Sequence, residues 1–295
     1  MIEKMLRGVG VALITPFNNY KIDYEALDRM IEHVIGGGVD YIVALGSTAE
    51  TATLSQEERR GVLRYVVERV AGRVPVVAGM GSNDTHALCE HLQSYDLSGT
   101  VAILSVVPYY NKPSQEGIYR HYMAVAEASP VPVIIYNVPG RTGVNMTADT
   151  TLRLAHASKN IVAVKEASGD IEQMQRILDG RPEGFLVLSG DDGITVELVK
   201  RGGDGVISVA ANAFPKLFCG CVHEALDGNI AKAERIIKEL DEPIHLLFRE
   251  GNPTGVKCMT AAMGITRDEP RLPLVAGSDA LREDMIKAIE RYELR

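Results

Sequence analysis

The sequence is poor in the residue patterns that build metal centres and disulfide frameworks. Its four cysteines form no CxxC pair, and its seven histidines form no HExxH or HxH cluster. Neither a dedicated metal site nor a disulfide framework is therefore expected. Cys219 and Cys221 stand two residues apart in a stretch with helical periodicity, so they point to different faces of the expected helix. We interpret the cysteines as buried structural thiols.

Basic clusters and long apolar runs are also missing. The chain has 31 Lys and Arg against 39 Asp and Glu, a formal net charge of −8, without a block of basic residues. This balance argues against nucleic acid or an anionic membrane as a partner, but allows a small anionic substrate at a locally positive site. No apolar run reaches spanning length, and residues 1–7 have no apolar core of signal-peptide length. We therefore expect a reduced, cytoplasmic protein.

The chain does contain a regular alternation of short apolar runs and segments with helical periodicity. Asp23 is expected to cap one helix, and Ser55 with Glu58 forms a capping box at the start of another. The expected strands cover residues 8–14, 41–45, 74–78, 101–107, 131–136, 161–164 running into Lys165, 185–188 and 205–208. Strict alternation predicts a parallel sheet.

A count of eight strands favours an α/β fold of the closed (β/α)8 type, the TIM barrel, which typically takes ~250 residues. Helical periodicity continues beyond the last strand. We therefore divide the chain into a catalytic barrel, residues 1–225, and a C-terminal helical extension, residues 226–295. Neither G-x-G-x-x-G after the first strand nor G-x-x-x-x-G-K-[ST] is present, so a nucleotide cofactor lacks its usual anchor.

Lys165 is the unusual residue of this pattern, because it ends the apolar run Ile161 to Val164. Burial of an ammonium group lowers its pKa from the ordinary value of ~10.4, and a neutral amine can form a Schiff base with a carbonyl compound. The alternative is an ordinary strand-end lysine whose head group reaches water. In a TIM barrel the active site lies at the carboxyl ends of the strands, which favours the reactive lysine.

Other polar residues follow the expected strands at the same face. Tyr136 is placed to transfer protons at an imine, or else is a buried aromatic with a satisfied hydroxyl. Ser47 and Thr48 suit a carboxylate but equally suit an ordinary turn. Arg141 could bind a second carboxylate or lie on the surface. The pair at residues 191–192 favours a loop or helix-cap role over a metal site, since no third ligand stands at useful spacing.

These segments together resemble one family. They are Gly46-Ser-Thr-Ala-Glu50, Pro108-Tyr-Tyr-Asn-Lys-Pro-Ser-Gln-Glu-Gly117, Tyr136-Asn-Val-Pro-Gly-Arg-Thr-Gly143, Val164-Lys-Glu-Ala-Ser-Gly169, Ser189-Gly-Asp-Asp192 and Gly205-Val-Ile-Ser208. The sequence resembles the pyruvate-dependent class I aldolases of the dihydrodipicolinate synthase and N-acetylneuraminate lyase type. The Tyr-Asn-Val-Pro-x-Arg-Thr-Gly segment is similar to the synthase branch. This resemblance implies condensation of pyruvate with L-aspartate 4-semialdehyde to 4-hydroxy-tetrahydrodipicolinate, on the diaminopimelate route to lysine.

The resemblance also implies residue roles. Lys165 would form the imine with pyruvate, and Arg141 would bind the carboxylate of the semialdehyde. Further roles are proton relay for Thr48, Tyr136 and Tyr110, with Tyr110 coming from a neighbouring subunit, and substrate binding for Ser47, Thr48, Gly190 and the main chain at Ile207. The resemblance implies a homotetramer built as a dimer of dimers, without metal or cofactor. The main rival is a superfamily lyase acting on a sugar-derived 2-keto acid, against which Arg141 argues.

Two departures from the family pattern stand out. Ala49 replaces a glycine of the family motif Gly-Thr-Thr-Gly-Glu, which restricts the backbone of the loop expected to bind the carboxylate. At the site where lysine inhibits some members, Gln56 and Arg59 stand in place of histidines and Ala87 in place of a glutamate. The resemblance therefore implies weak or absent feedback inhibition by lysine.

Overall fold

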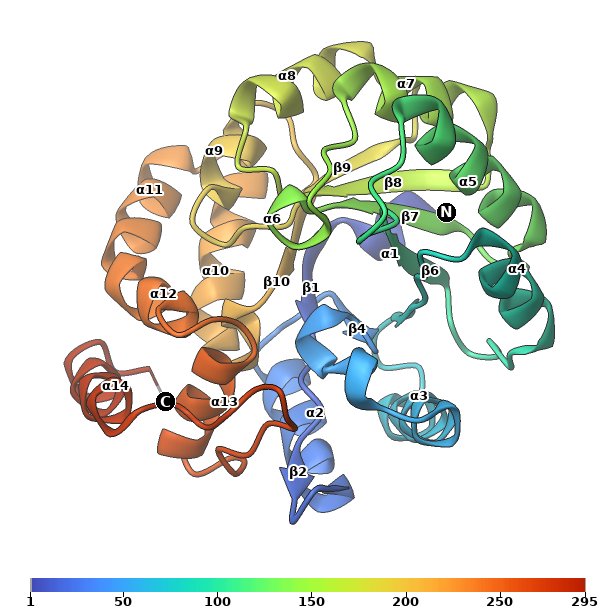
Figure 1. Cartoon of the computed structure of the whole chain (residues 1–295). Coiled ribbons are helices and arrows are strands. Elements are labelled where there is room, and N and C mark those ends of the chain that lie inside the picture. Colours follow the sequence, from blue (N-terminus) through green and yellow to red (C-terminus); the bar gives the residue numbers. More distant parts are fainter. Residues whose placement is uncertain (1, 295) are drawn as a thin grey trace.

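The computed structural model describes residues 2–294 and consists of a parallel barrel surrounded by helices. The strands close in the order β1-β10-β9-β8-β7-β6-β5-β4 and back to β1 (Figure 1). The expected (β/α)8 fold is confirmed. The barrel strands are β1 (Gly8–Ala12), β4 (Tyr41–Ala44), β5 (Val76–Gly79), β6 (Ala102–Val106), β7 (Val133–Asn137), β8 (Ile161–Glu166), β9 (Leu186–Ser189) and β10 (Gly205–Ser208).

Two strands begin two residues later than the sequence suggested, and β6 and β9 begin one residue later. We expected strands from residues 74 and 131, but β5 begins at Val76 and β7 at Val133. Pro75 and Pro132 precede them, and each accepts a hydrogen bond from the neighbouring strand without being able to donate one. A small antiparallel hairpin after β1, formed by β2 (Phe17–Asn18) and β3 (Lys21–Ile22), was not predicted.

A helix follows each barrel strand and covers its outer face. The expected caps are present: the side chain of Asp23 accepts from the backbone of Ala26, and Ser55 and Glu58 form the capping box. The covering helices are α2 (Tyr24–Gly36), α3 (Gln56–Val70), α4 (Thr85–Ser94), α5 (Gln115–Ala128), α7 (Ala148–Ala157), α8 (Ile171–Gly180), α9 (Thr195–Lys200) and α10 (Pro215–Leu226). Short helices α1 (Ile2–Leu6) and α6 (Pro139–Thr142) stand before β1 and after β7. None of the helices within residues 2–294 is both long and apolar enough to cross a membrane.

Two apolar layers hold the barrel together. Along β7, Ile134 and Tyr136 belong to the cluster inside the barrel, whereas Val133 and Ile135 belong to the main core between strands and helices. Strands buried on both faces explain the near-continuous apolar runs in the sequence. The same alternation places Lys165 inside the barrel, next to Tyr136, its Cα partner in the parallel ladder.

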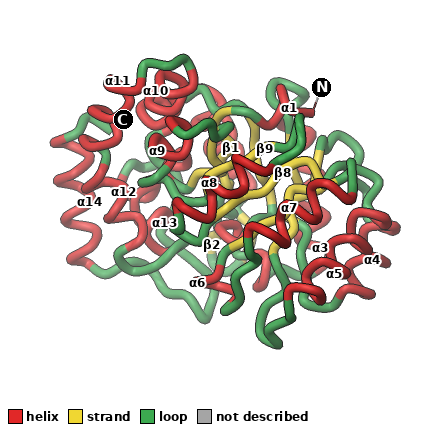
Figure 2. Tube along the Cα trace, turned by 90° about the horizontal axis from the view of Figure 1, so that it is seen from above, coloured by secondary structure: helices red, strands yellow, loops and turns green. Residues whose placement is uncertain are grey.

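The C-terminal extension packs on one side of the barrel (Figures 1 and 2). It consists of α11 (Ile230–Glu239), α12 (Asp241–Phe248), α13 (Thr254–Ala262) and α14 (Asp279–Arg291). Apolar side chains of α13 and α14, such as Met259 and Leu281, belong to the same main core as the barrel. The division at residues 225 and 226 stays a prediction; α10, the last covering helix, ends at Leu226.

Buried charges also join the extension to the barrel. Lys257 of α13 forms an ion pair with Glu50, in the loop after β4, and both side chains are 1% exposed. The Lys257 amine lies 4.0 Å from the centre of the Phe17 ring. Arg271 donates its backbone N–H to Glu50 at 2.8 Å and pairs through its guanidinium with Glu58 at 2.5 Å. Lys257 and Arg271, which lie in the C-terminal extension, therefore stabilise the loop between β4 and α3.

Replacement of Lys257 tests this connection. K257M leaves the Glu50 carboxylate buried without its cationic partner, so we expect the free energy of unfolding to fall by about 3–5 kcal/mol. The double variant E50Q/K257M should lose less, because it removes the second charge as well. Urea denaturation followed by circular dichroism measures both. K287M removes the exposed lysine that pairs with Asp284 and serves as control; an equal loss for K257M and K287M would contradict the structural role.

Candidate active site

Lys165 lies near the carboxyl end of β8 and points into the barrel. Its side chain is buried, with 5% of the residue exposed, and its amine lies 4.3 Å from the centre of the Tyr136 ring. Burial lowers the pKa of Lys165 to about 7, Asp192 acts against this shift, and Arg141 adds to it. Near neutral pH a substantial fraction of the amine is therefore uncharged and nucleophilic. The reactive-lysine interpretation is the one that this geometry favours.

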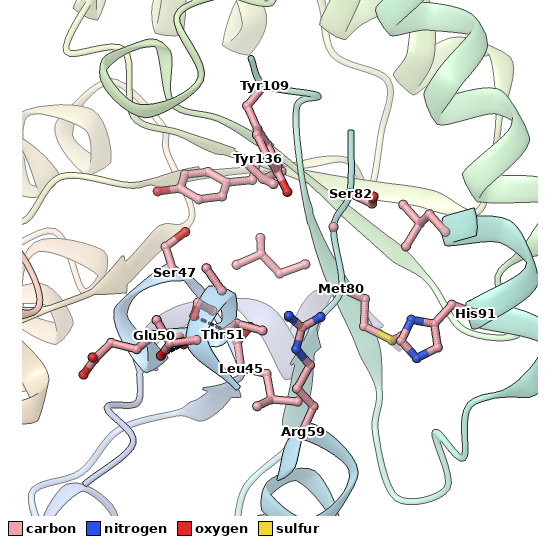
Figure 3. A pocket seen from close by; sticks show the side chains of 18 of the residues that line it. Leu45, Ser47, Glu50, Thr51, Arg59, Met80, Ser82, His91, Tyr109 and Tyr136 are labelled. Atoms are coloured by element: carbon pink, nitrogen blue, oxygen red, sulfur yellow. Dashed lines mark hydrogen bonds between the residues drawn. The ribbon is translucent and has the colours of Figure 1, made fainter. Parts of the chain in front are cut away.

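A small cavity of about 190 Å³ surrounds the amine. Its wall brings together residues from barrel strands, from the loops that follow them and from the C-terminal extension, including Ser47, Thr48, Tyr136, Arg141, Lys165, Gly190 and Asn252. Ser47, Tyr136, Arg141 and Asn252 also line a larger adjoining cavity of about 810 Å³. Figure 3 shows the hydroxyls of Ser47 and Tyr136 on the same side of this larger cavity. A small substrate can thus reach Lys165 from the surface.

Ser47 and Thr48 lie in a 3-10 turn, Ser47–Ala49, directly after β4. Backbone N–H groups at the start of such a turn have no acceptor within it, which suits a carboxylate. Ala49, the residue that departs from the family motif, is 1% exposed and does not adopt a positive φ. Glu50 takes the left-handed conformation instead, with φ 55°. The loop therefore accommodates Ala49 without strain at that position.

Arg141 lies on α6, in the connection that follows β7, and its guanidinium donates to the main-chain oxygen of Asn252 at 3.0 Å. The side chain of Asn252 in turn donates to the hydroxyl of Thr48 at 3.0 Å. Asn252, from the extension, thus connects two predicted site residues. No local pattern in the sequence links Asn252 to residues 204 and 111 positions away.

Asp192 is a second residue whose place the sequence did not reveal. It is 2% exposed, and one carboxylate oxygen accepts from the backbone of Val209 at 3.2 Å and of Ala210 at 3.0 Å. Burial raises the pKa of Asp192 to about 6, although the hydrogen bond from Ser208 opposes the rise. Its neighbour Asp191 has the expected loop role, accepting from the backbone of Gly193 at 2.9 Å. Within residues 2–294, no three His, Cys, Asp or Glu side chains group as metal ligands.

The remaining candidates differ in position. Gly190 lies against the lysine, since a Cβ built on it would lie 3.1 Å from Cε of Lys165. Ile207 is buried in β10, inside the barrel. Tyr110 is 82% exposed with φ 73° and, within residues 2–294, lines neither cavity, whereas Tyr109 lines the larger one. The expectation that Tyr110 enters a neighbouring subunit's site stays a prediction.

Comparisons with known proteins show which family the chain belongs to. Residues 5–292 match the dihydrodipicolinate synthetase family. The chain belongs to that family. It is 53% identical over 276 residues to a 4-hydroxy-tetrahydrodipicolinate synthase of Phocaeicola vulgatus, covering 93% of each chain. A relative of the same name from Porphyromonas gingivalis is 48% identical over 297 residues, with both chains fully covered.

Solved structures of family members share the architecture. A dihydrodipicolinate synthase of Thermotoga maritima is 38% identical with a TM-score of 0.96, covering 99% of this chain and 100% of that one. A structure described as the first monomeric dihydrodipicolinate synthase variant is also 38% identical with a TM-score of 0.96, covering 99% of each chain.

The charge environment of Lys165 predicts a pH dependence. The pKa of Lys165 is about 7, so imine formation with pyruvate should slow as the pH falls through 7 and the amine becomes protonated. In D192N the carboxylate that raises this pKa is lost, so the midpoint should move to lower pH. Initial rates of adduct formation, trapped by a timed borohydride quench at each pH, measure it. D191N is the control, because it removes the adjacent carboxylate, leaves Asp192 in place and should shift the midpoint less. A midpoint in D192N that is equal to or higher than that of the wild type would contradict the prediction.

Proposed function

We propose that this chain is a 4-hydroxy-tetrahydrodipicolinate synthase that condenses pyruvate with L-aspartate 4-semialdehyde through an imine on Lys165. The observation that carries the proposal is the buried amine of Lys165, whose pKa is lowered to about 7, in a cavity beside Tyr136 and Arg141. Membership of the family, and relatives of this name at 53% and 48% identity, support the choice of reaction. The product feeds the diaminopimelate route to lysine.

The first half of the reaction uses the lysine and the loop after β4. The neutral amine of Lys165 attacks the C2 carbonyl of pyruvate, and loss of water from the resulting carbinolamine gives the imine. We assign the backbone at Ser47 and Thr48 to the pyruvate carboxylate. We assign proton transfer to and from the departing water to the hydroxyl of Tyr136, with Thr48 as the next member of the relay. Burial raises the pKa of Tyr136, which keeps its hydroxyl protonated.

The second half forms the carbon–carbon bond. Loss of a C3 proton turns the protonated imine into an enamine, whose C3 attacks the aldehyde carbon of the semialdehyde, while Arg141 holds the carboxylate of that substrate. The amino group of the added substrate then attacks C2, closes the ring and releases Lys165. One water leaves overall. The imine nitrogen is the electron sink, so the proposed chemistry requires neither metal nor cofactor, and Gly190 and Ile207 complete the substrate wall.

The proposal extends to assembly and location. We infer a homotetramer, a dimer of dimers, in which Tyr110 reaches the site of a neighbouring subunit. Its support is a large aromatic side chain that is 82% exposed at a positive φ, an arrangement costly for an isolated chain. We also infer a cytoplasmic location, supported by four cysteines that are all free thiols.

Borohydride reduction tests the imine. Incubation with pyruvate and borohydride should add one reduced pyruvate to the peptide that contains Lys165, detected by peptide mass analysis. K165A should give no adduct and no turnover, because, within residues 2–294, no other lysine lines the small cavity. As a control, K112A removes a lysine of the loop after β6 and should keep the adduct. An adduct on any other lysine would refute the mechanism.

Arg141 decides the second substrate. R141A removes charge-assisted hydrogen bonds, so kcat/KM for the semialdehyde should fall about 10- to 100-fold, whereas the pyruvate adduct at Lys165 should still form. Steady-state kinetics with each substrate varied measures the two effects. R120A, which changes an arginine 78% exposed on α5, is the matched control. Cleavage of N-acetylneuraminate or a keto-deoxy sugar acid, without turnover of the semialdehyde, would favour the rival lyase.

A further inference from the structure

Directly behind the cavity, a cluster of three buried polar side chains and one half-buried one lies on the outer face of β7 and β8. Its members are Asn137 and Glu166, both 0% exposed, Gln173 at 2%, and Asn145 from the connection that follows α6. We call these four residues the outer polar cluster. None of them lines either cavity at the site. A substrate in either cavity would therefore not touch them. A buried carboxylate is costly unless its partners compensate, so its presence here calls for a structural reason.

Glu166 is the centre of the cluster, and each of its partners is a hydrogen-bond donor. Its two oxygens accept from the side-chain amide of Asn137 at 3.1 and 3.0 Å. One oxygen also accepts from the backbone of Ser168 at 2.8 Å, and the other from the amide of Gln173 at 3.0 Å. An ionised carboxylate satisfies all these donors at once, which no neutral side chain of the same shape can do.

The cluster also holds together the two ends of the segment that contains α6 and Arg141. The side-chain oxygen of Asn137 accepts from the backbone of Met146 at 2.9 Å, and its amide donates to Asn145 at 2.7 Å. Asn145 in turn donates to Gln173 at 2.9 Å. The two ends of the segment 137–146 are thereby held together, with α6 and Arg141 between them.

The chain connects this cluster directly to the reacting groups. Asn137 follows Tyr136 in β7, and Glu166 follows Lys165 in β8. Across the ladder, Tyr136 is the Cα partner of Lys165, and Asn137 is the Cα partner of Glu166. Successive residues of a strand point to opposite faces, about 3.3 Å apart along the chain. A hydrogen bond between the two outward side chains therefore fixes the separation and register of the two inward ones.

We propose that Glu166 is a positioning residue, which sets the distance between the Lys165 amine and Tyr136 by holding β7 to β8 from behind through Asn137 and Gln173. This inference rests on the proposed imine chemistry at Lys165. A displacement of 1 Å at a reacting group costs about 100-fold in rate, so register at this point matters more than register elsewhere in the barrel. Ser47 and Thr48 lie in the turn after β4, a strand that pairs with neither β7 nor β8, so the groups assigned to the pyruvate carboxylate come from another part of the barrel.

Glu166→Gln is the direct test. The substitution keeps the shape but places an NH2 group against the donors of Asn137 or Gln173, so one or more hydrogen bonds break. We expect kcat and the rate of imine formation to fall about 10- to 100-fold, while KM for pyruvate changes little. Stopped-flow or a timed borohydride quench measures the rate of imine formation. Steady-state kinetics measures kcat and KM for pyruvate separately.

The matched control lies at the other end of the same strand. Asn160 precedes β8 and donates to the main-chain oxygens of Ala126 at 2.8 Å and Ser129 at 3.3 Å. N160A also removes hydrogen bonds from the β7–β8 region, but far from the reacting groups, so it should lower the melting temperature and leave the imine rate unchanged. Equal kinetic effects of E166Q and N160A would overturn the positioning role.

A milder variant keeps the proposal testable if E166Q does not fold. Q173L removes one donor from Glu166 and should slow imine formation by a smaller factor, again without a matching change in KM for pyruvate. An imine rate equal to wild type in folded Q173L or E166Q overturns the inference. The adduct of the wild-type protein distinguishes a failure of the proposed function from a failure of the positioning role. If the wild type forms no adduct at Lys165, the proposed function is wrong. If it forms the adduct and the variants form the imine at the same rate, only the positioning role is wrong.

Discussion

The site depends on keeping one ammonium group out of water. Burial lowers the pKa of Lys165 to about 7, and the closed barrel is what makes that burial possible, because its strands are covered on both faces. A lysine at the edge of an open sheet would reach solvent and keep its ordinary pKa. Asp192 counteracts this shift, so the pKa of the amine stays near 7 and both its charged and its neutral form are present at neutral pH.

The rest of the molecule supports that group from two sides. Behind the barrel wall, the hydrogen bonds among Asn137, Glu166 and Gln173 hold β7 against β8. From the other end of the chain, the extension supplies Lys257 to Glu50 and the contacts of Asn252 with Thr48 and Arg141. The extension is therefore part of the site as well as a cover for the barrel.

Most of the fold was predictable because its signals are local. Alternating apolar runs and helix caps identified the strand and helix positions, and the caps at Asp23 and Ser55 are present. The errors are local too: prolines at residues 75 and 132 shortened the ladder, and the two-residue strands after β1 are too short to give a periodic pattern. Among the site residues, Lys165 and Tyr136 could be predicted in the same way, because each ends a strand and strand ends meet at one face of a barrel.

The order of residues is enough to show that a lysine ends an apolar strand in an eightfold repeat, with a tyrosine at the end of the preceding strand and an arginine in the connection after it. Tertiary structure alone decided that Asp192 acts on the pKa of the amine, that Asn252 joins Thr48 to Arg141, and that Glu166 is the centre of a buried cluster. The physical reason is that periodicity encodes which face a side chain occupies. Hydrogen bonds and electrostatic interactions between buried groups depend instead on which distant segments the closed barrel brings within a few ångströms.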